Sequence, residues 1–296
     1  MIRAALARRL YDGLVRRATP LPAEFLDAPC LVVSPHPDDE TLGCGGLLAL
    51  KRERGVPVSV VYMTDGSGSH PGFADQRALA GRRRDEALAA CATLGIAEGD
   101  VHFLEVPDGT LAAAAASAVT RLAPLLDAHD RALLVLPHPD EPPSDHAATY
   151  HVTAQCLQAR GRRARALLYP VWLWDQWPFT NPFSPPRGRS SVRSIVRTAA
   201  RHRFGTGLRR TLDHRVDIGP VLARKRAALA AHTTQTVAPP DAPDWPVLAD
   251  VAHGEWLDHL MRPTELYGLT TLGAHDDTTE PAPAGAGRRG KEPHAH

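Results

Sequence analysis

The chain of 296 residues has no uncharged apolar run approaching the roughly 18 residues that a membrane-spanning helix requires. Its first 17 residues also lack the apolar core of a secretory signal, because arginines interrupt them every few positions. Both absences predict a cytoplasmic protein that does not span a membrane.

Cysteine is scarce and scattered. The four cysteines lie far apart, at positions 30, 44, 91 and 156, and none forms a CxxC pair. This spacing argues against a disulfide framework and against a cysteine zinc site, and it is typical of a reducing compartment. With 43% hydrophobic and 23% charged residues, the chain has the composition of a globular protein with a large core.

An excess of either charge is also lacking, since 34 Lys and Arg face 33 Asp and Glu and leave a net charge of +1. This balance argues against a nucleic-acid-binding protein. Two segments depart from it: residues 1–17 are acid-poor and amphipathic, and residues 187–215 carry nine arginines and one acid, Asp213. Both are candidates for peripheral membrane contact, and the second also for binding substrate phosphate. The alternatives are a helix packed on the domain and an ordinary solvated helix, because this chain uses arginine almost to the exclusion of lysine.

Short apolar runs alternate with longer segments of helical period, which predicts an α/β fold with a mainly parallel sheet and helices on both faces. The predicted strands are residues 30–34, 57–63, 101–104, 132–136 and 166–169, with 216–218 as an added edge strand. The predicted helices are residues 41–54, 76–94, 111–128, 146–159, 220–232 and 245–261. We expect a helical extension over residues 1–28, one domain over 29–272 and a disordered tail over 273–296.

Residues 172–186 hold three of the five tryptophans and four prolines, which favours a loop over a helix. We expect this loop to cover a pocket. Trp174 and its neighbours could stack on a sugar face, and packing within the core is an equally good interpretation.

The densest polar cluster is SPHPDDE at positions 34–40, at the carboxyl end of the first predicted strand. One imidazole and three carboxylates crowd a stiff loop there, and a cation makes such crowding of like charges favourable. His36 and Asp39 can turn toward one point and bind zinc, which needs a third protein ligand in a catalytic site. The alternative is that Asp38 or Asp39 only caps the following helix.

The third ligand is expected from another strand end, where PHPDEPPSDH occupies positions 137–146. His146 opens the next helix and would project toward the first loop. The acid beside the metal, Asp38, could then take a proton from a metal-activated water, which implies hydrolysis of an amide or ester. Glu40 is expected to support the site without binding the metal.

A nucleotide-binding module is the main rival, because Gly43, Gly45 and Gly46 follow the first strand. Their spacing does not fit G-x-G-x-x-G, and the HPDDE carboxylates would repel a pyrophosphate. We therefore expect these glycines to allow close packing of helix on sheet.

Several segments together resemble the PIG-L or LmbE-like zinc-dependent deacetylases of N-acetylated amino sugars. They are PHPDDETLGCGG, VVYMTDGSGSH, RRDEALAACATLG, FLEVPDG, the Asp145–His146 pair, YPVWLW and KRAALAAHTTQ, and they extend over about residues 29–270. The resemblance implies a Rossmann-like three-layer fold and a small amino-sugar or glycoconjugate substrate. It implies His36, Asp39 and His146 as ligands of zinc, with Fe²⁺ as an alternative, Asp38 as the general base, and Asp145 as a support for the ligands. It further implies that Arg83, paired with Glu86 in R-x-x-E, and Asp108 face sugar hydroxyls.

The resemblance also exposes a departure. Family members usually carry a histidine shortly before the Asp–His pair, and it stabilises the oxyanion, whereas this chain has Pro143 there. His138 is the expected substitute, with Tyr150 and His70 as further candidates near the substrate. The alternatives are an amidase acting on a larger sugar conjugate and a sugar-binding homologue with weakened activity.

Overall fold

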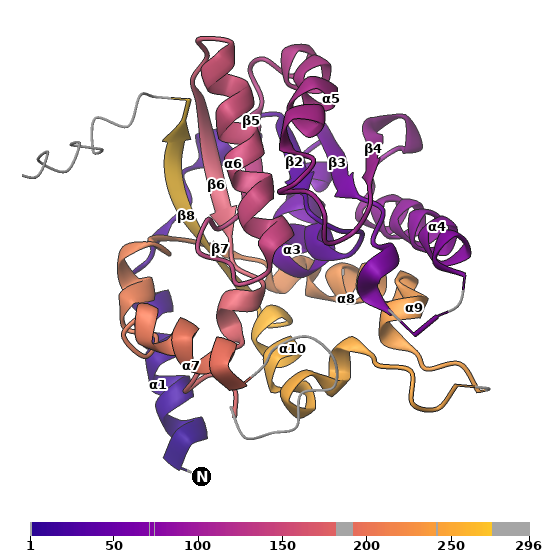
Figure 1. Ribbon diagram of the computed structural model, residues 1–296. Coiled ribbons are helices and arrows are strands. Elements are labelled where there is room, and N and C mark those ends of the chain that lie inside the picture. Colours follow the sequence, from indigo (N-terminus) through magenta and orange to yellow (C-terminus); the bar gives the residue numbers. More distant parts are fainter. Residues whose placement is uncertain (1, 71, 74, 182–191, 241, 274–296) are drawn as a thin grey trace, which may run out of the picture.

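The computed structural model describes residues 2–70, 72–73, 75–181, 192–240 and 242–273, which form an eight-stranded sheet covered by helices on both faces (Figure 1). The strands are β1 Thr19–Pro20, β2 Cys30–Ser34, β3 Val58–Thr64, β4 Val101–Val106, β5 Leu133–Pro137, β6 Ala164–Tyr169, β7 His214–Asp217 and β8 Thr264–Leu272. The α-helices are α1 Ile2–Arg17, α2 Ala23–Asp27, α3 Asp39–Glu53, α4 Gln76–Leu94, α5 Ala115–Ala128, α6 Ser144–Ala159, α7 Val192–Arg201, α8 Leu222–Ala231, α9 Thr233–Thr236 and α10 Glu255–Leu260. Short 3₁₀ turns lie at Ser67–Ser69, Glu98–Asp100, Trp172–Trp174, Gly207–Arg210, Gly219–Val221 and Leu248–Gly254.

The strand order is β1-β7-β8-β6-β5-β2-β3-β4. Strands β6, β5, β2, β3 and β4 pair in parallel, and β8 runs antiparallel to both β6 and β7. The chain winds from β2 outward through β3 and β4, then returns to β5 on the other side of β2. This is the Rossmann-like arrangement expected from the sequence.

The side chains of β2 show why the sheet is covered on both faces. Leu31 and Val33 belong to one buried cluster with α5 and α6, whereas Cys30 and Val32 belong to another with α3 and α4. All four are at most 1% exposed. A strand that is buried on both faces has a continuous run of apolar residues, and such runs predict these strands from the sequence.

The five parallel strands β2 to β6 were predicted to within two residues, but the arrangement at the other end of the sheet, around β1, β7 and β8, was not. Residues 216–218 were expected as an edge strand, whereas β7 lies between β1 and β8. The expectation of an edge was wrong because β8 was not recognised and β1 has only two residues.

The N-terminal segment is built into the sheet. The buried face of α1 includes Tyr11 and Leu14, and β1 pairs in parallel with β7. The domain boundary at residue 28 stays a prediction. The expected disordered tail lies outside the described residues except for Gly273, as do residues 182–186 of the expected loop and Arg187 and Arg189. Among the described residues, no helix has both the length and the apolar character to cross a membrane.

The tryptophans of the expected pocket cover are part of the core. Trp172 stacks on Trp256 with ring centroids 4.5 Å apart, and Trp174 stacks on His259 at 5.6 Å. Both tryptophans are at most 5% exposed. These contacts support the packing interpretation of Trp174 and give the segment from Trp172 to Trp174 no lid character.

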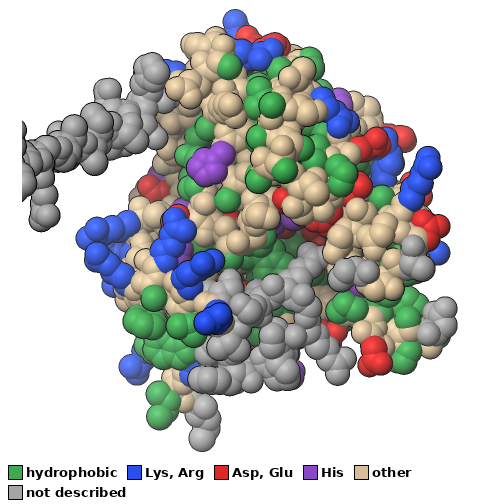
Figure 2. All heavy atoms as spheres, in the orientation of Figure 1, with side chains coloured by type: hydrophobic (Ala, Val, Ile, Leu, Met, Phe, Trp, Pro, Cys, Tyr) green, Lys and Arg blue, Asp and Glu red, His purple; other side chains and the backbone are tan. Residues whose placement is uncertain are grey.

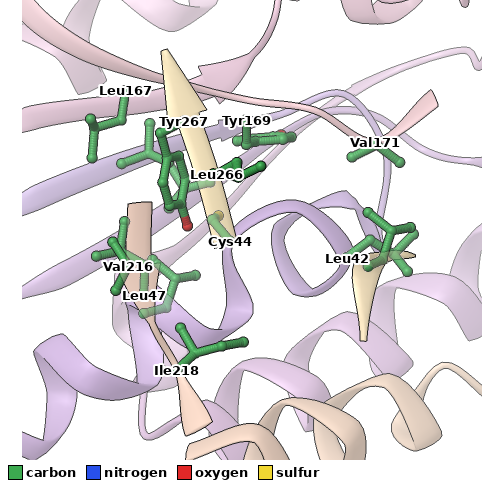
Figure 3. Close-up of a cluster of buried hydrophobic side chains, with 14 of the residues drawn as sticks. Leu42, Cys44, Leu47, Leu167, Tyr169, Val171, Val216, Ile218, Leu266 and Tyr267 are labelled. Carbon is green, nitrogen blue, oxygen red and sulfur yellow. The ribbon is translucent and has the colours of Figure 1, made fainter. Parts of the chain in front are cut away.

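Two of the glycines in α3 let this helix pack closely on its neighbours, as expected. A Cβ atom on Gly43 would lie 2.2 Å from the Tyr169 ring, and one on Gly46 would lie 2.5 Å from Ile218. Figure 3 shows this cluster, in which Leu42, Cys44 and Leu47 of α3 lie among residues of β6, β7 and β8. The close packing holds α3 against the end of β6 and against Ile218, which follows β7.

Candidate active site

Two loops meet where the chain changes direction across the sheet. Strand β2 pairs with β5 in parallel, from Cys30 opposite Leu133 to Val32 opposite Val135. The segments after both strands therefore lie side by side at the carboxyl edge, which is the position where open α/β sheets bind ligands. Both polar clusters of the sequence are brought together at this point.

A buried triad of His36, Asp39 and His146 forms the centre of the site. Asp39 Oδ2 lies 3.1 Å from His36 Nδ1 and 3.2 Å from His146 Nε2. One ligand atom from each residue falls within 4.8 Å of the others. Two nitrogens and a carboxylate oxygen in this proximity are a suitable donor set for a divalent transition metal.

Each histidine of the triad has a carboxylate behind its second ring nitrogen. His36 Nε2 lies 3.1 Å from Asp108 Oδ1 and 3.5 Å from Asp145 Oδ2, and His146 Nδ1 lies 3.2 Å from Glu141 Oε2. Metal-binding histidines are usually oriented by a carboxylate in this way. These contacts place Asp108, which was expected to face sugar hydroxyls, beside His36.

Backbone groups fix the supporting carboxylates in turn. Asp145 accepts hydrogen bonds from the N–H groups of Gly109 and Leu111, at 2.7 and 3.2 Å. Glu141 accepts three, from the N–H groups of residues 171–173 at 2.7 to 3.0 Å, and it is 3% exposed. Sequence reasoning gave no role to Glu141; its place in the run PHPDEPPSDH was the available signal.

The triad fits a metal ion because the two ring nitrogens of His146 lie 3.2 Å from carboxylate oxygens without making well-aligned hydrogen bonds. Its ring is fully buried, and among the described residues neither ring nitrogen makes a contact with hydrogen-bond geometry. A buried polar atom left in this way costs free energy unless another ligand satisfies it. A cation between His146, His36 and Asp39 would be such a ligand.

Burial and charge act against each other in the triad. Burial alone would lower the pKa of His146, but Asp39 and Glu141 outweigh it and raise the pKa to about 9. Burial would likewise raise the pKa of Asp39, but His146 and His36 hold it well below its usual value. Because a metal ligand must be a neutral imidazole, metal binding here would release protons.

Asp38 lies next to the triad in a conformation that a non-glycine residue rarely adopts, with φ 138°. Its backbone N–H donates to Glu40 Oε2 at 3.1 Å, and its Oδ2 lies 3.0 Å from Arg83 Nη2. Its side chain makes no capping hydrogen bond to α3, which removes support for the simple capping alternative. Strained backbone of this kind is concentrated at functional sites.

Arg83 is fully buried and holds the loop from beneath. Its guanidinium donates to the carbonyl oxygens of Gly66, at 2.9 Å, and of Pro37, in addition to its contact with Asp38. A Cβ on Gly66 would lie 2.5 Å from Arg83 Nη1, so only glycine allows this approach. These contacts place Arg83 beneath the loop of residues 34–40, and its expected contact with sugar hydroxyls stays a prediction.

The segment HTTQ at 232–235 completes the framework, although its residues were given no individual role from sequence. His232 Nε2 lies 3.2 Å from Glu40 Oε1, and this carboxylate, despite the opposing effect of burial, raises the pKa of His232. Glu86 accepts hydrogen bonds from the hydroxyl of Thr233 and from Thr234. Residues more than 140 positions apart thus hold α3 and α4 together.

The expected substitutes for the missing oxyanion histidine lie in different places. His138 Nδ1 accepts a hydrogen bond from the Asp140 N–H at 3.1 Å, so its ring proton resides on Nε2, and burial lowers its pKa. His70 stacks on Trp245 with centroids 3.8 Å apart, and Tyr150 meets His151 edge-on. Of the three, His138 directly follows β5 and lies in the loop that carries Glu141.

A cavity of about 410 Å³ borders the loop that follows β2, at Pro37. Its other lining residues come from the ends of β3 and β4 and from α4: Asp65, Arg77, Ala80, Gly81, Arg84, Phe103 and Glu105. Arg84 pairs with Glu105 at 2.9 Å. Among the described residues, Arg77 makes no ion pair.

Residues 31–157, which contain all three members of the triad, match the family described as PIG-L, GlcNAc-PI de-N-acetylase. A 1D-myo-inositol 2-acetamido-2-deoxy-alpha-D-glucopyranoside deacetylase of Nocardia farcinica is 30% identical over 71% of this chain and 81% of its own length. The chain belongs to the PIG-L family.

One further relative and one solved structure are similar to this chain over different lengths. A probable N-acetyl-alpha-D-glucosaminyl L-malate deacetylase 2 of Bacillus subtilis is 38% identical over 27% of this chain, and the match spans only 38% of that protein. The N,N'-diacetylchitobiose deacetylase of Pyrococcus horikoshii superimposes with a TM-score of 0.59 at 19% identity, covering 91% of this chain and 93% of that one. At this identity the superposition establishes the shared fold.

Proposed function

We propose that this protein is a metal-dependent hydrolase that removes the acetyl group from an N-acetylated amino sugar or its conjugate. The observation that carries the proposal is the buried His36, Asp39 and His146 triad with Asp38 beside it. Its relatives are named for deacetylation of sugar conjugates, which agrees with this chemistry.

His36, Asp39 and His146 would hold the metal, with Asp108, Asp145 and Glu141 orienting the two rings. Zinc suits two imidazoles and one carboxylate, and Fe²⁺ is the alternative that this donor set also admits. When bound, such an ion polarises a carbonyl group and makes water more acidic.

Asp38 would act as the general base and accept a proton from the attacking water. The water oxygen adds to the acetyl carbon, the C–N bond breaks, and the amine leaves with a proton while acetate forms. Arg83 and Glu40 keep Asp38 in its strained conformation throughout, because they bind its carboxylate and its backbone N–H. His138, which carries its ring proton on Nε2, would donate to the developing oxyanion in place of the residue replaced by Pro143.

Metal content and acetate release test the proposal together. We expect about one zinc or iron per wild-type chain, near none in His146→Ala, and acetate release from N-acetyl sugars that Asp38→Asn abolishes without loss of the metal. His151→Ala, on the exposed side of α6, is the matched control and should retain both. A wild-type protein that stays metal-free after reconstitution would contradict the hydrolase and leave a sugar-binding homologue.

A larger conjugate is a second candidate substrate, and the cavity next to Pro37 favours it. Arg77 makes no ion pair there among the described residues, so an anionic group attached to the sugar could bind it. Two relatives are named for an L-malate and a myo-inositol conjugate. We expect Arg77→Ala to raise KM for an anionic conjugate several-fold and to leave a free N-acetyl sugar unaffected; equal effects on both would exclude this subsite.

A further inference from the structure

Exposed arginines are concentrated on α1, α7 and the residues that follow α7. Residues 2–17 and 192–213 carry two exposed acids, Asp12 and Asp213, against ten exposed arginines: Arg8, Arg9, Arg16, Arg17, Arg193, Arg197, Arg201, Arg203, Arg209 and Arg210. Of the ten, Arg201 pairs with Asp140, and the other nine make no ion pair with any described residue. This excess of positive charge contrasts with the balanced charge of the whole chain.

The two segments form one continuous surface, which we call the basic surface. A Cβ on Gly13 of α1 would lie 3.5 Å from Arg209 Nη2, and one on Gly205 would lie 3.8 Å from Leu10 Cδ1. Figure 1 draws α1 and α7 together at the lower left, and Figure 2 shows Lys and Arg side chains with hydrophobic ones among them in that region. The arginines of α7 recur every four residues and thus share one helix face.

Exposed apolar side chains lie on the same surface. The described residues include four large hydrophobic side chains that are more than half exposed, and three belong to these segments: Ile2 at 89%, Val196 at 52% and Phe204 at 52%. Exposure of large apolar side chains to water is unfavourable. Apolar side chains among cationic ones are typical of surfaces that dock on a partner.

The backbone presents Phe204 in a strained turn. Arg203 and Phe204 have φ values of 49° and 56°, and Gly205 follows at 82°. Two successive non-glycine residues in the left-handed region cost free energy, which a purely solvated loop has no reason to retain. Phe204 is held there by an edge-on contact with Trp177, with centroids 5.5 Å apart.

We propose that the basic surface docks the protein on a bilayer containing anionic lipid. Arginines would bind the phosphate groups at the membrane surface, while Ile2, Val196 and Phe204 enter the boundary between headgroups and acyl chains. Nucleic acid offers the same negative charge but no apolar phase for the aliphatic Ile2 and Val196. The apolar side chains therefore favour the membrane.

Vesicle co-sedimentation of the full chain tests the docking. We expect binding to phosphatidylcholine vesicles with about 30% phosphatidylglycerol to be at least tenfold tighter than to phosphatidylcholine alone, and to weaken between roughly 0.05 and 0.5 M salt. The triple variant Arg193→Glu, Arg197→Glu, Arg210→Glu should lose this binding. The matched variant Arg121→Glu, Arg131→Glu, Arg163→Glu changes net charge equally on other exposed positions and should retain it.

A second pair of measurements separates the membrane from other polyanions. Val196→Ser with Phe204→Ser leaves the charge unchanged and should weaken vesicle binding several-fold, with no change in acetate release from a soluble sugar. Equal loss in both charge variants, or equal binding to both vesicle types, would overturn the proposal. So would binding to duplex DNA or RNA tighter than to vesicles, with no effect of the serine variants.

Discussion

At the scale of single residues, the framework around Asp38 explains how a strained backbone persists in a buried loop. Glu40 binds the N–H of Asp38, Arg83 binds its carboxylate, and His232 holds Glu40 in turn. These contacts come from α3, α4 and the segment before α9. Removing one of them should therefore change the position of Asp38 before it changes the fold.

Arg83→Lys tests this positioning. Lysine keeps the positive charge but cannot reach the Gly66 and Pro37 carbonyl oxygens and Asp38 together, because it lacks the planar fork of arginine. We expect kcat to fall roughly 10- to 100-fold with little change in KM. Steady-state kinetics on a small N-acetyl sugar measure both constants.

The neighbouring Arg82→Lys is the matched control for this variant, since Arg82 is exposed on the same helix. Its kcat should stay within about twofold of the wild-type value. If Arg83→Lys instead raised KM at constant kcat, Arg83 would bind substrate, as the family resemblance implied.

The buried side chain of His259 should make the folded protein less stable in mild acid. Burial, with the nearby charge of Arg262, lowers the pKa of His259 to about 4. His259 is therefore protonated below about pH 6.5 in the unfolded chain but only below about pH 4 in the folded protein. Because the unfolded chain binds more protons between these values, the free energy of unfolding falls as pH decreases through this window. The loss amounts to at most about 3.5 kcal/mol, at roughly 1.4 kcal/mol for each pKa unit.

His259→Phe keeps an aromatic ring among Tyr11, Trp174 and Phe179 and removes the titrating group. Denaturant unfolding at several pH values should show a smaller acid loss in this variant than in the wild type. His151→Phe, on an exposed position, serves as the control. An identical pH dependence of all three proteins would show that His259 does not contribute.

Some residues of the candidate site could be predicted from the sequence, and others could not. His36, Asp39 and His146 stand out because polar clusters follow two buried strands. The roles of Glu141 and His232 did not follow from sequence, since each acts through a partner distant along the chain or through backbone N–H groups that only the fold brings near. The same limit applies to Arg83, whose partners lie 17 and 46 positions away.

At the scale of elements, α3 must both carry the acids of the candidate site and pack closely on its neighbours. Its first turn carries Asp39 and Glu40, while its middle must approach Tyr169 and Ile218 closely. Glycine satisfies the second requirement at a cost in helix propensity. The sequence predicted this packing because the glycines failed the nucleotide-binding spacing.

Gly43→Ala measures the requirement for close packing. The added methyl would lie 2.2 Å from the Tyr169 ring, which must shift within the core, so we expect a loss of roughly 1 to 3 kcal/mol in the free energy of unfolding. Gly81→Ala in α4 meets no atom within 4 Å and should instead stabilise by roughly 0.5 to 1 kcal/mol. Denaturant unfolding checks both, and equal effects at the two sites would contradict the packing argument.

Prediction of elements succeeded where burial on both faces produces a strong pattern and was incomplete at the end of the sheet formed by β1, β7 and β8. Strand β8 has a mixed burial pattern, and Gly268 interrupts it where the carbonyl oxygen of Thr211 approaches closely. Its antiparallel pairing with β6 and β7 depends on contacts distant in sequence. Such a strand carries little local signal.

At the scale of the whole molecule, the candidate site joins two halves of the sheet. His36 and Asp39 follow β2, whereas His146 begins α6 after β5, so a metal bound by all three links segments more than 100 residues apart. Because an unfolded chain does not bring these ligands together, metal binding should stabilise the folded state by mass action.

Chelation tests this link without any assay of activity. At a metal concentration about 100 times Kd, binding adds roughly 2.7 kcal/mol, which corresponds to a rise in Tm of roughly 5 °C for a chain of this length. Removal of the metal by a chelator should reverse the rise, and its return should restore it. Glu141→Gln should require about 10 to 100 times more metal for the same shift, since Glu141 orients His146. His146→Ala should show no shift at any metal concentration, and a full shift in this variant would place the stabilising metal elsewhere in the protein.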